Sequence, residues 1–155
     1  MSGESPSALT TTGVYSAPAA EVDRFLAQAR AELRRLWPVE AWAAVGRGAK
    51  IVDTRPEHQR RAAGEIPGAI VIERNHLEWR LDPTCDSRIP EADSRHIQWI
   101  VICAEGYSSS LAAAALRELG LDNATDVIGG VDAWVAAGLP TIHPSQPTAP
   151  RGPGE

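Results

Sequence analysis

The sequence has only two cysteines, Cys85 and Cys103, in 155 residues. Two cysteines cannot build the disulfide framework of a small secreted domain, and they do not form a zinc site by themselves. The four histidines are scattered along the chain without the spacing of metal ligands. The sequence therefore predicts no metal site, and a lone cysteine of this kind is more often a small buried hydrophobic residue than a nucleophile.

Long apolar runs and an excess of positive charge are also absent. No segment approaches the ~18 consecutive apolar residues needed to span a bilayer. The first residues, MSGESPSALTTTG, lack the basic and apolar parts of a signal peptide. We therefore expect a cytoplasmic protein with no membrane contact. The formal net charge of -5 argues against nucleic-acid binding, which needs a basic face.

The length and composition are those of one folded domain with tails. A chain of 155 residues, 43% of them hydrophobic, can bury a core without disulfides. The first residues are rich in Ser, Thr, Ala, Gly and Pro and have no periodicity, and the last are rich in Pro and Gly. We expect a disordered tail at 1–19, a domain at 20–142 and a second disordered tail at 143–155.

Helical periodicity marks the start of the domain, over 22–36, and Pro38 is placed to open a second short helix. Short apolar strands then alternate with helices. The predicted strands are 51–53, 69–72, 97–102 and 125–128, and the predicted helices are 56–63, 75–81, 109–119 and 131–137. The polar segment 82–95 is expected to be a surface loop. The five tryptophans are most simply core residues.

This alternation predicts an α/β fold with a central, mainly parallel sheet of four to five strands and helices on both faces. In such sheets, binding and catalytic sites form at the carboxyl ends of the strands. The predicted strand that ends at Ile102 is apolar enough to lie in the middle of the sheet. Cys103 follows it directly, so the loop that begins there is the expected site.

Cys103 would lie between a strand end and the N-terminus of a helix. Unpaired backbone N–H groups of the loop and of the first helical turn can point at the sulfur, and the helix dipole favours negative charge there. Both effects favour the thiolate, which is the nucleophilic form. Gly106 lets the loop curl around the sulfur, and Ser108 to Ser110 can cap the helix or donate hydroxyl hydrogen bonds.

Four segments resemble the rhodanese-like family. The stretch from Cys103 to Ser109 is similar to the family's active-site loop, Cys-x-x-Gly-x-Arg/Thr/Ser followed by a small residue. Asp-Thr-Arg at 53–55 resembles its Asp-Val-Arg, and Gly-Glu-Ile-Pro-Gly-Ala at 64–69 resembles its Gly-His-Ile-Pro-Gly-Ala. Residues 129–140 resemble its closing Gly-Gly-x-x-Ala-Trp-x-x-x-Gly-Leu-Pro. The four segments in order, over roughly residues 38–141, are a specific signal.

The resemblance implies a rhodanese-like fold and a two-step sulfur transfer that needs no metal or organic cofactor. The Cys103 thiolate would take the outer sulfur of thiosulfate or of a persulfide, and a thiol, cyanide or a sulfur-carrier protein would then remove it. The resemblance also implies that the loop amides and their flanks bind the donor. These residues are Ala104, Glu105, Gly106, Tyr107, Ser108 and Ser109.

The loop departs from the family pattern in its charge. Glu105 lies beside the nucleophile and repels an anionic donor, and Ser108 takes the position of the family's loop arginine. Arg74, after the second strand, is therefore a candidate donor-binding cation. Asp53 and Arg55, at the end of the first strand, are expected to support the site, most simply as a buried ion pair.

Other functions stay open. A non-catalytic rhodanese-fold module for binding or regulation is compatible with the missing cation, and a sulfur-relay partner of a cysteine desulfurase would use the same Cys103. A phosphatase or arsenate reductase is disfavoured, because the Cys-x5-Arg pattern needs an arginine at position 109, which is Ser109. Cys85, in the polar loop, is more simply an incidental thiol than a resolving cysteine.

Overall fold

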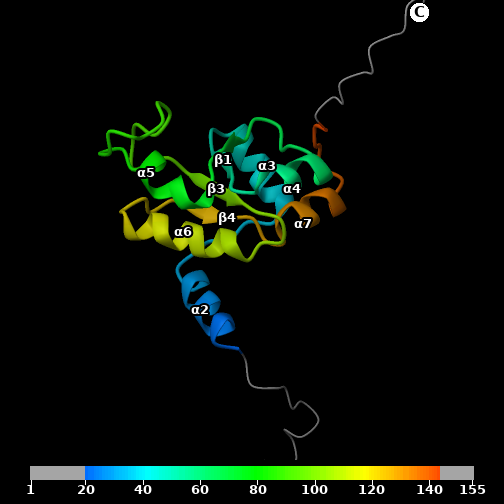
Figure 1. Cartoon of the computed structure of the whole chain (residues 1–155), viewed down its shortest axis with the longest axis horizontal. Coiled ribbons are helices and arrows are strands. Elements are labelled where there is room, and N and C mark those ends of the chain that lie inside the picture. Colours follow the sequence, from blue (N-terminus) through cyan, green and yellow to red (C-terminus); the bar gives the residue numbers. More distant parts are fainter. Residues whose placement is uncertain (1–19, 144–155) are drawn as a thin grey trace, which may run out of the picture.

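The computed structural model describes residues 20–143 (Figure 1). The tails expected at 1–19 and 143–155 lie, apart from His143, outside the described residues. Between residues 20 and 143, no helix has both the length and the apolar character that a membrane span requires.

The centre of the fold is a four-stranded parallel sheet with the strand order β2-β1-β3-β4. Its strands are β1 (Lys50–Asp53), β2 (Ile70–Val71), β3 (Trp99–Ile102) and β4 (Thr125–Asp126). Each lies within a predicted strand or overlaps it, although β2, β3 and β4 are shorter than predicted. The expectation of a mainly parallel sheet of four to five strands is confirmed.

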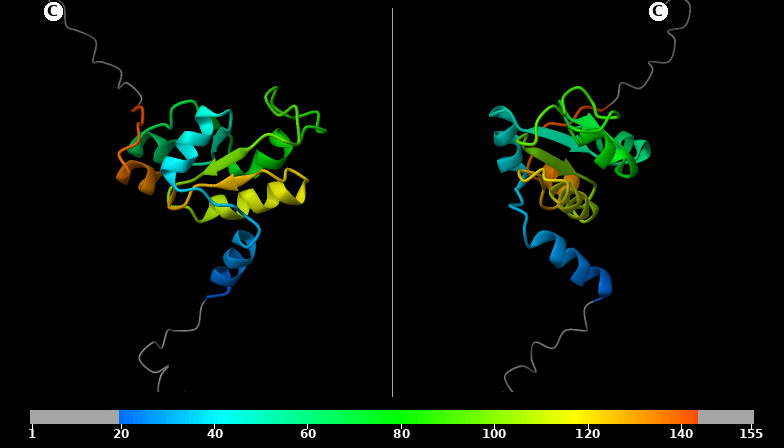
Figure 2. Two further views of the ribbon diagram at one scale, coloured as in Figure 1. Left: turned by 180° about the vertical axis from the view of Figure 1, so that it is seen from behind. Right: turned by 90° about the vertical axis from the view of Figure 1, so that its left-hand side faces the viewer.

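Helices cover both faces of this sheet, as the alternating pattern predicts (Figures 1 and 2). The helices of the structure are α2 (Glu21–Arg30), α3 (Pro38–Gly46), α4 (Glu57–Ala63), the short 3-10 helix η1 (Arg74–His76), α5 (Leu77–Leu81), α6 (Ser108–Glu118) and α7 (Gly130–Ala136). Helices α5 and α6 pack on one face, and α3 and α7 pack on the other. The α/β fold class is therefore confirmed.

Strand β3 divides the core between the two faces, because side chains alternate along a strand. Trp99 and Val101 pack with α5 and α6, whereas Ile100 and Ile102 pack with α3 and α7. All four are fully buried, and each contributes about 2 kcal/mol through the hydrophobic effect. This burial fixes the end of β3, and hence the position of residue 103.

The tryptophans do not all follow the expectation of a buried core. Trp99 and Trp134 are fully buried, but Trp37 and Trp79 are each 59% exposed. Trp42 is partly exposed and packs edge-on against Trp134, with 5.6 Å between the ring centroids. The prediction is wrong for the exposed residues because hydrophobic type alone does not say which face of a helix or loop meets the sheet.

The first helix is shorter than predicted. The periodicity over 22–36 predicts one continuous helix, but α2 ends at Arg30. Leu36 instead forms a parallel bridge with Val127, and its backbone exchanges hydrogen bonds with Asp126 and Ile128 beside β4. At Leu36 the backbone therefore pairs with the sheet, although the helical periodicity continues through this residue. Helix α2 lies against α6 and projects away from the body of the domain (Figure 2).

Candidate active site

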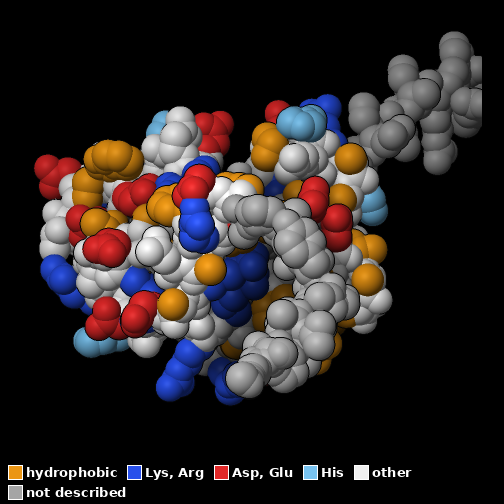
Figure 3. Space-filling view, turned by 90° about the horizontal axis from the view of Figure 1, so that it is seen from below, with side chains coloured by type: hydrophobic (Ala, Val, Ile, Leu, Met, Phe, Trp, Pro, Cys, Tyr) orange, Lys and Arg blue, Asp and Glu red, His pale blue; other side chains and the backbone are white. Residues whose placement is uncertain are grey.

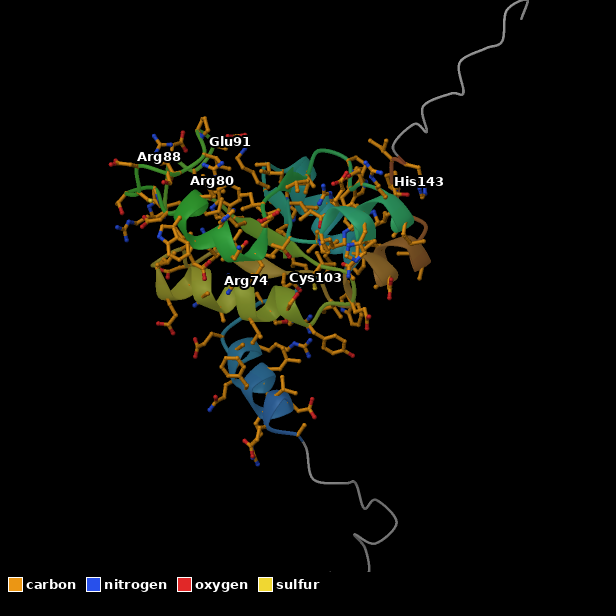
Figure 4. All side chains as sticks on the ribbon, viewed as in Figure 1. Arg74, Arg80, Arg88, Glu91, Cys103 and His143 are labelled. Atoms are coloured by element: carbon orange, nitrogen blue, oxygen red, sulfur yellow. The ribbon has the colours of Figure 1, made fainter. Side chains whose placement is uncertain are left out.

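Cys103 follows β3 directly, and its side chain is closed in by the loop that leads to α6 (Figure 4). The residue is 6% exposed. Its Sγ accepts hydrogen bonds from the backbone N–H groups of Gly106, at 3.2 Å, and Ser109, at 3.3 Å. The loop thus curls around the sulfur and directs backbone donors at it, as the sequence predicts.

This arrangement favours negative charge on the sulfur. Ser109 lies in the first turn of α6, an 11-residue helix whose first N–H groups have no partner within the helix. The helix dipole and the two donors both stabilise an anion at this place. A thiolate or a persulfide anion on Cys103 would therefore be held by backbone groups rather than by a cationic side chain of the loop.

The start of helix α7 holds the Cys103 loop through backbone hydrogen bonds. The N–H of Val131 donates to the Cys103 carbonyl at 2.9 Å, and the N–H of Asp132 donates to the Ala104 carbonyl at 3.0 Å. A Cβ on Gly130 would lie 2.4 Å from the Cys103 carbonyl oxygen. Gly130 is therefore needed at the start of α7, because only a residue without a side chain fits against the loop there.

A buried carboxylate, which the sequence analysis does not identify, fixes the start of α6. Asp126, at the end of β4, is fully buried and accepts hydrogen bonds from the Ser109 and Ser110 hydroxyls, each at 2.7 Å. Arg35 donates to the same carboxylate from Nε at 2.9 Å. The serines therefore do not cap α6, whose N-cap, Tyr107, has no side-chain cap hydrogen bond. The sequence did contain a signal for this carboxylate, because Asp126 is a charged residue within a short apolar strand.

The site opens into a pocket of about 310 Å³. Its lining is Thr54, Arg55, Pro56, Gln59, Cys103, Ala104, Glu105, Tyr107 and Ser108. Four of the predicted loop residues therefore line the pocket, and two others, Gly106 and Ser109, supply the donors to Sγ. Glu105 is exposed and is the only carboxylate of this lining.

Asp53 and Arg55 form the expected ion pair below the pocket. The Arg55 guanidinium donates to the carboxylate of Asp53, with 2.7 Å between Nη2 and Oδ2, and also to the Gly64 carbonyl at 2.8 Å. Both side chains are buried. Because Asp53 balances its charge, Arg55 lines the pocket without giving it a net positive charge, although its Nη1 has no hydrogen-bond partner among the described residues.

Arg74 lies away from the pocket lining. Its guanidinium donates to the carboxylate of Glu78, one turn along the chain, at 2.8 Å and 3.0 Å. The side chain is 39% exposed, and Arg74 is not among the residues that line the pocket. The local ion pair holds it on η1 and α5 (Figure 4), so a role in donor binding stays a prediction that this geometry does not support.

Two other hollows among residues 20–143, of about 420 Å³ and 350 Å³, are lined by Cys85. The Sγ of Cys85 accepts one backbone N–H, at 3.4 Å, against two for Cys103. A larger hollow, of about 490 Å³, lies between α2 and α6, and neither cysteine lines it. Within residues 20–143, no three His, Cys, Asp or Glu side chains gather as ligands for a metal ion. The pocket at Cys103 is therefore the candidate active site.

A family model described as the rhodanese-like domain matches residues 38–137. This chain belongs to the rhodanese-like domain family. Among its relatives, thiosulfate sulfurtransferase GlpE of Haemophilus influenzae is 32% identical over 108 residues, which cover 69% of this chain and 92% of that protein. Adenylyltransferase and sulfurtransferase MOCS3 of Arabidopsis thaliana is 32% identical over 106 residues, which cover 63% of this chain but only 22% of that longer protein.

Solved structures share the fold of this chain. A Rhodopseudomonas palustris protein of unknown function, RPA3614, named as a possible tyrosine phosphatase, aligns with a TM-score of 0.71 and 28% identity over 82% of this chain and 98% of that chain. The polysulfide-sulfur transferase homodimer of Wolinella succinogenes aligns with a TM-score of 0.65 and 23% identity, over 82% and 90% of the two chains. The second match bears on the fold alone.

Proposed function

We propose that this chain is a sulfurtransferase that carries sulfur as a persulfide on Cys103. The observation that carries the proposal is the Sγ atom of Cys103, which accepts two backbone N–H hydrogen bonds at a pocket in a rhodanese-like domain. Relatives with the same domain are named as sulfurtransferases, which supports the reaction class.

In the first step, the Cys103 thiolate attacks the outer sulfur of the donor. A new S–S bond forms to Sγ while the S–S bond of the donor breaks, and the electron pair leaves as sulfite from thiosulfate or as a thiolate from a persulfide. The N–H groups of Gly106 and Ser109, which now point at Sγ, would stabilise the anionic persulfide.

In the second step, an acceptor thiolate or cyanide attacks the outer sulfur of the persulfide. The bond between that sulfur and Sγ breaks, and its electron pair returns to Cys103 as the thiolate. Sulfur moves as a neutral atom in both steps, so the cycle needs no external oxidant or reductant. A metal or organic cofactor has no part in this cycle.

The charges at the pocket favour a persulfide donor over thiosulfate. Glu105 lines the pocket, and the charge of Arg55 is balanced by Asp53. A dianionic donor such as thiosulfate meets repulsion there, which is about 1 kcal/mol for unit charges roughly 4 Å apart in water. A protein-bound persulfide, delivered by a cysteine desulfurase or by a sulfur-carrier protein, depends less on a cation in the pocket.

Residues 20–142 form the domain, and its loop residues from Ala104 to Ser109 hold the donor. We also propose that the protein works in the cytoplasm, with a small sulfur donor and a thiol, cyanide or sulfur-carrier acceptor. Nucleic acid and membrane are not among its expected partners.

A tyrosine phosphatase function is less well supported, although one structural relative is named as a possible one. Phosphate binding in a cysteine loop relies on bidentate contact with a guanidinium. Position 109 is a serine whose hydroxyl donates to Asp126 behind the loop. A non-catalytic binding module remains the second alternative, and the two backbone N–H groups that donate to Cys103 Sγ argue for chemistry instead.

Mass measurement of the intact protein tests the proposal. The protein is incubated with thiosulfate and, separately, with a cysteine desulfurase and cysteine, and the Cys103→Ser variant is treated in parallel. We expect the mass to increase by one sulfur atom in the wild type and to stay unchanged in the variant. An adduct that forms only with the desulfurase favours the relay form of the function, and no adduct with either donor contradicts the proposal.

A further inference from the structure

Two arginines contact the Cys103 loop from its outer side. Arg30, the last residue of α2, donates from Nη2 to the Gly106 carbonyl at 2.8 Å. Arg35 donates from Nη2 to the same carbonyl at 3.0 Å. Basic side chains gather near the centre of the face drawn in Figure 3. One peptide group of the loop is thus bound by two guanidinium groups that come from outside the loop.

The geometry of that peptide transmits the contact to the site. In a trans peptide the C=O and the next N–H point in opposite directions, and the described residues contain no cis peptide. Because the two arginines hold the Gly106 carbonyl, the Tyr107 N–H of the same peptide points away from them, and the N–H groups of Gly106 and Ser109 on either side of it donate to Sγ. Two cations on the oxygen also polarise the peptide and strengthen its N–H as a donor.

The balance of charge behind the loop is positive. Arg35 is paired with Asp126, which also accepts the two serine hydroxyls. Arg30 has no carboxylate partner within residues 20–143: its other contacts are the Ser110 hydroxyl at 3.0 Å and the ring of Tyr107 at 5.8 Å. Two guanidinium groups and one carboxylate leave one uncompensated positive charge next to the loop.

We propose that Arg30 is a positioning residue that supplies, through the Gly106 carbonyl, the positive charge that the Cys103 loop itself lacks. Arg35 and Asp126 hold the same carbonyl and the start of α6 in place. Arg30 lies before the segment that the rhodanese-like family model matches, 38–137. Helix α2 therefore contributes to this site through its last residue, Arg30. The inference rests on the proposed function only in taking Cys103 as the sulfur nucleophile.

Alkylation of Cys103 by iodoacetamide tests the inference, because it reports on the anionic sulfur and needs no sulfur transfer. The measurement uses the full chain with Cys85→Ser, so that a single thiol reacts. Arg30→Gln removes the charge, and Arg30→Lys keeps it. Arg34→Gln is the matched control, because Arg34 is exposed in the same segment and its side chain makes no hydrogen bond among the described residues.

We expect Arg30→Gln to slow alkylation at neutral pH roughly threefold or more, since one charge acts at short range through protein rather than water. Arg30→Lys should recover most of the rate, and Arg34→Gln should match the parent protein. The difference between Arg30→Gln and the parent should shrink in high salt, which screens the charge. Thermal unfolding of each variant shows that the domain is folded.

A purely structural role of Arg30 predicts the opposite change in the alkylation rate of Cys103. If Arg30 only keeps the loop closed over the thiol, its removal exposes Cys103 and alkylation becomes faster. That result, or equal rates for Arg30→Gln and Arg34→Gln, overturns the inference. A protein that is alkylated as expected but never gains sulfur contradicts the proposed function alone, so the two failures are distinguishable.

Discussion

Two segments of this domain each carry one cysteine, and they hold it in different ways. The loop between β3 and α6 surrounds Cys103, whose sulfur accepts two backbone hydrogen bonds and is almost fully enclosed. The segment 82–98, between α5 and β3, carries Cys85, which is half-buried and accepts one longer hydrogen bond, from the Ser87 N–H at 3.4 Å.

The difference lies in where the hydrogen-bond partners come from. The turns that contain Cys85 are closed by residues a few positions away: its own N–H donates to Asp82, and its carbonyl accepts from Arg88. The Cys103 loop is held by residues that are 70 or more positions earlier, such as Arg30 and Arg35. Figure 4 places Arg80, Arg88 and Glu91 at one end of the molecule, away from Cys103.

The comparison shows what makes a thiol a candidate nucleophile in this fold. Local turns can position a cysteine, but here they leave its sulfur half-buried and with one weak donor. Long-range contacts from α2, β4 and α7 hold the loop around Cys103, and the loop N–H groups of Gly106 and Ser109 donate to its Sγ.

The largest effect is expected from removing one cysteine or the other. Cys103→Ser should reduce thiocyanate formation from a sulfur donor and cyanide to the background rate, because the hydroxyl cannot carry the sulfur. Cys85→Ser should stay within about twofold of the wild type, since exposed substitutions away from a site have small effects. A comparable loss in both variants would mean that Cys85 takes part in turnover.

The close packing of the Cys103 loop should make Gly106 hard to replace. Its φ is +87°, and an added Cβ would lie 2.6 Å from the Gly129 nitrogen. Gly106→Ala should therefore lower the free energy of unfolding by about 3 kcal/mol or more and impair sulfur transfer. Gly48 is the control: its φ is +107°, but an added Cβ would meet nothing within 4 Å.

Gly48→Ala should cost only the backbone strain, about 1–2 kcal/mol. Urea unfolding of both variants measures the difference. Equal losses would show that the contact between Gly106 and Gly129 adds nothing beyond backbone conformation.

The two regions also differ in how much one carboxylate contributes to the stability of the fold. Asp126 is fully buried and binds Arg35, so Asp126→Asn should cost about 2–4 kcal/mol, because it leaves a partly buried guanidinium without its charge partner. Asp82 accepts hydrogen bonds from the N–H and hydroxyl of Thr84 at the surface. Asp82→Asn should cost less than about 0.5 kcal/mol. Denaturant midpoints near pH 7 compare them, and equal costs would refute the contrast.

The smallest expected effect is the pH dependence at Asp82. Hydrogen bonds from the Thr84 backbone and side chain hold the pKa of Asp82 below its ordinary value of 3.8. A lowered pKa in the folded state stabilises the fold above the ordinary value, and this contribution is lost as the pH falls through the lowered one. The stability difference between wild type and Asp82→Asn, a few tenths of a kcal/mol at most, should therefore shrink between pH 6 and pH 3. A difference that grows with acid contradicts this assignment.

Much of the fold could be predicted from the sequence, because its signals are local. The buried strand before Cys103 is a continuous apolar run, and the helices on both sides of the sheet have apolar faces at helical spacing. The loop residues that surround Sγ adjoin the cysteine in the chain, so their position near the sulfur follows from the position of Cys103. The length of α2 could not be predicted, because Leu36 has the same apolar character in a helix as in a bridge to Val127.

The sequence by itself determined the elements, the parallel sheet and the thiol at the carboxyl end of its central strand, since apolar periodicity and the family motifs carry that information. Only the tertiary structure decided the charges around the thiol. Arg55 is balanced by Asp53, and Arg74 is held by Glu78. Arg30 contacts the loop at the Gly106 carbonyl and has no carboxylate partner within residues 20–143. Ion pairing depends on distances in space, and residues 30 and 106 meet only because α2 packs against α6.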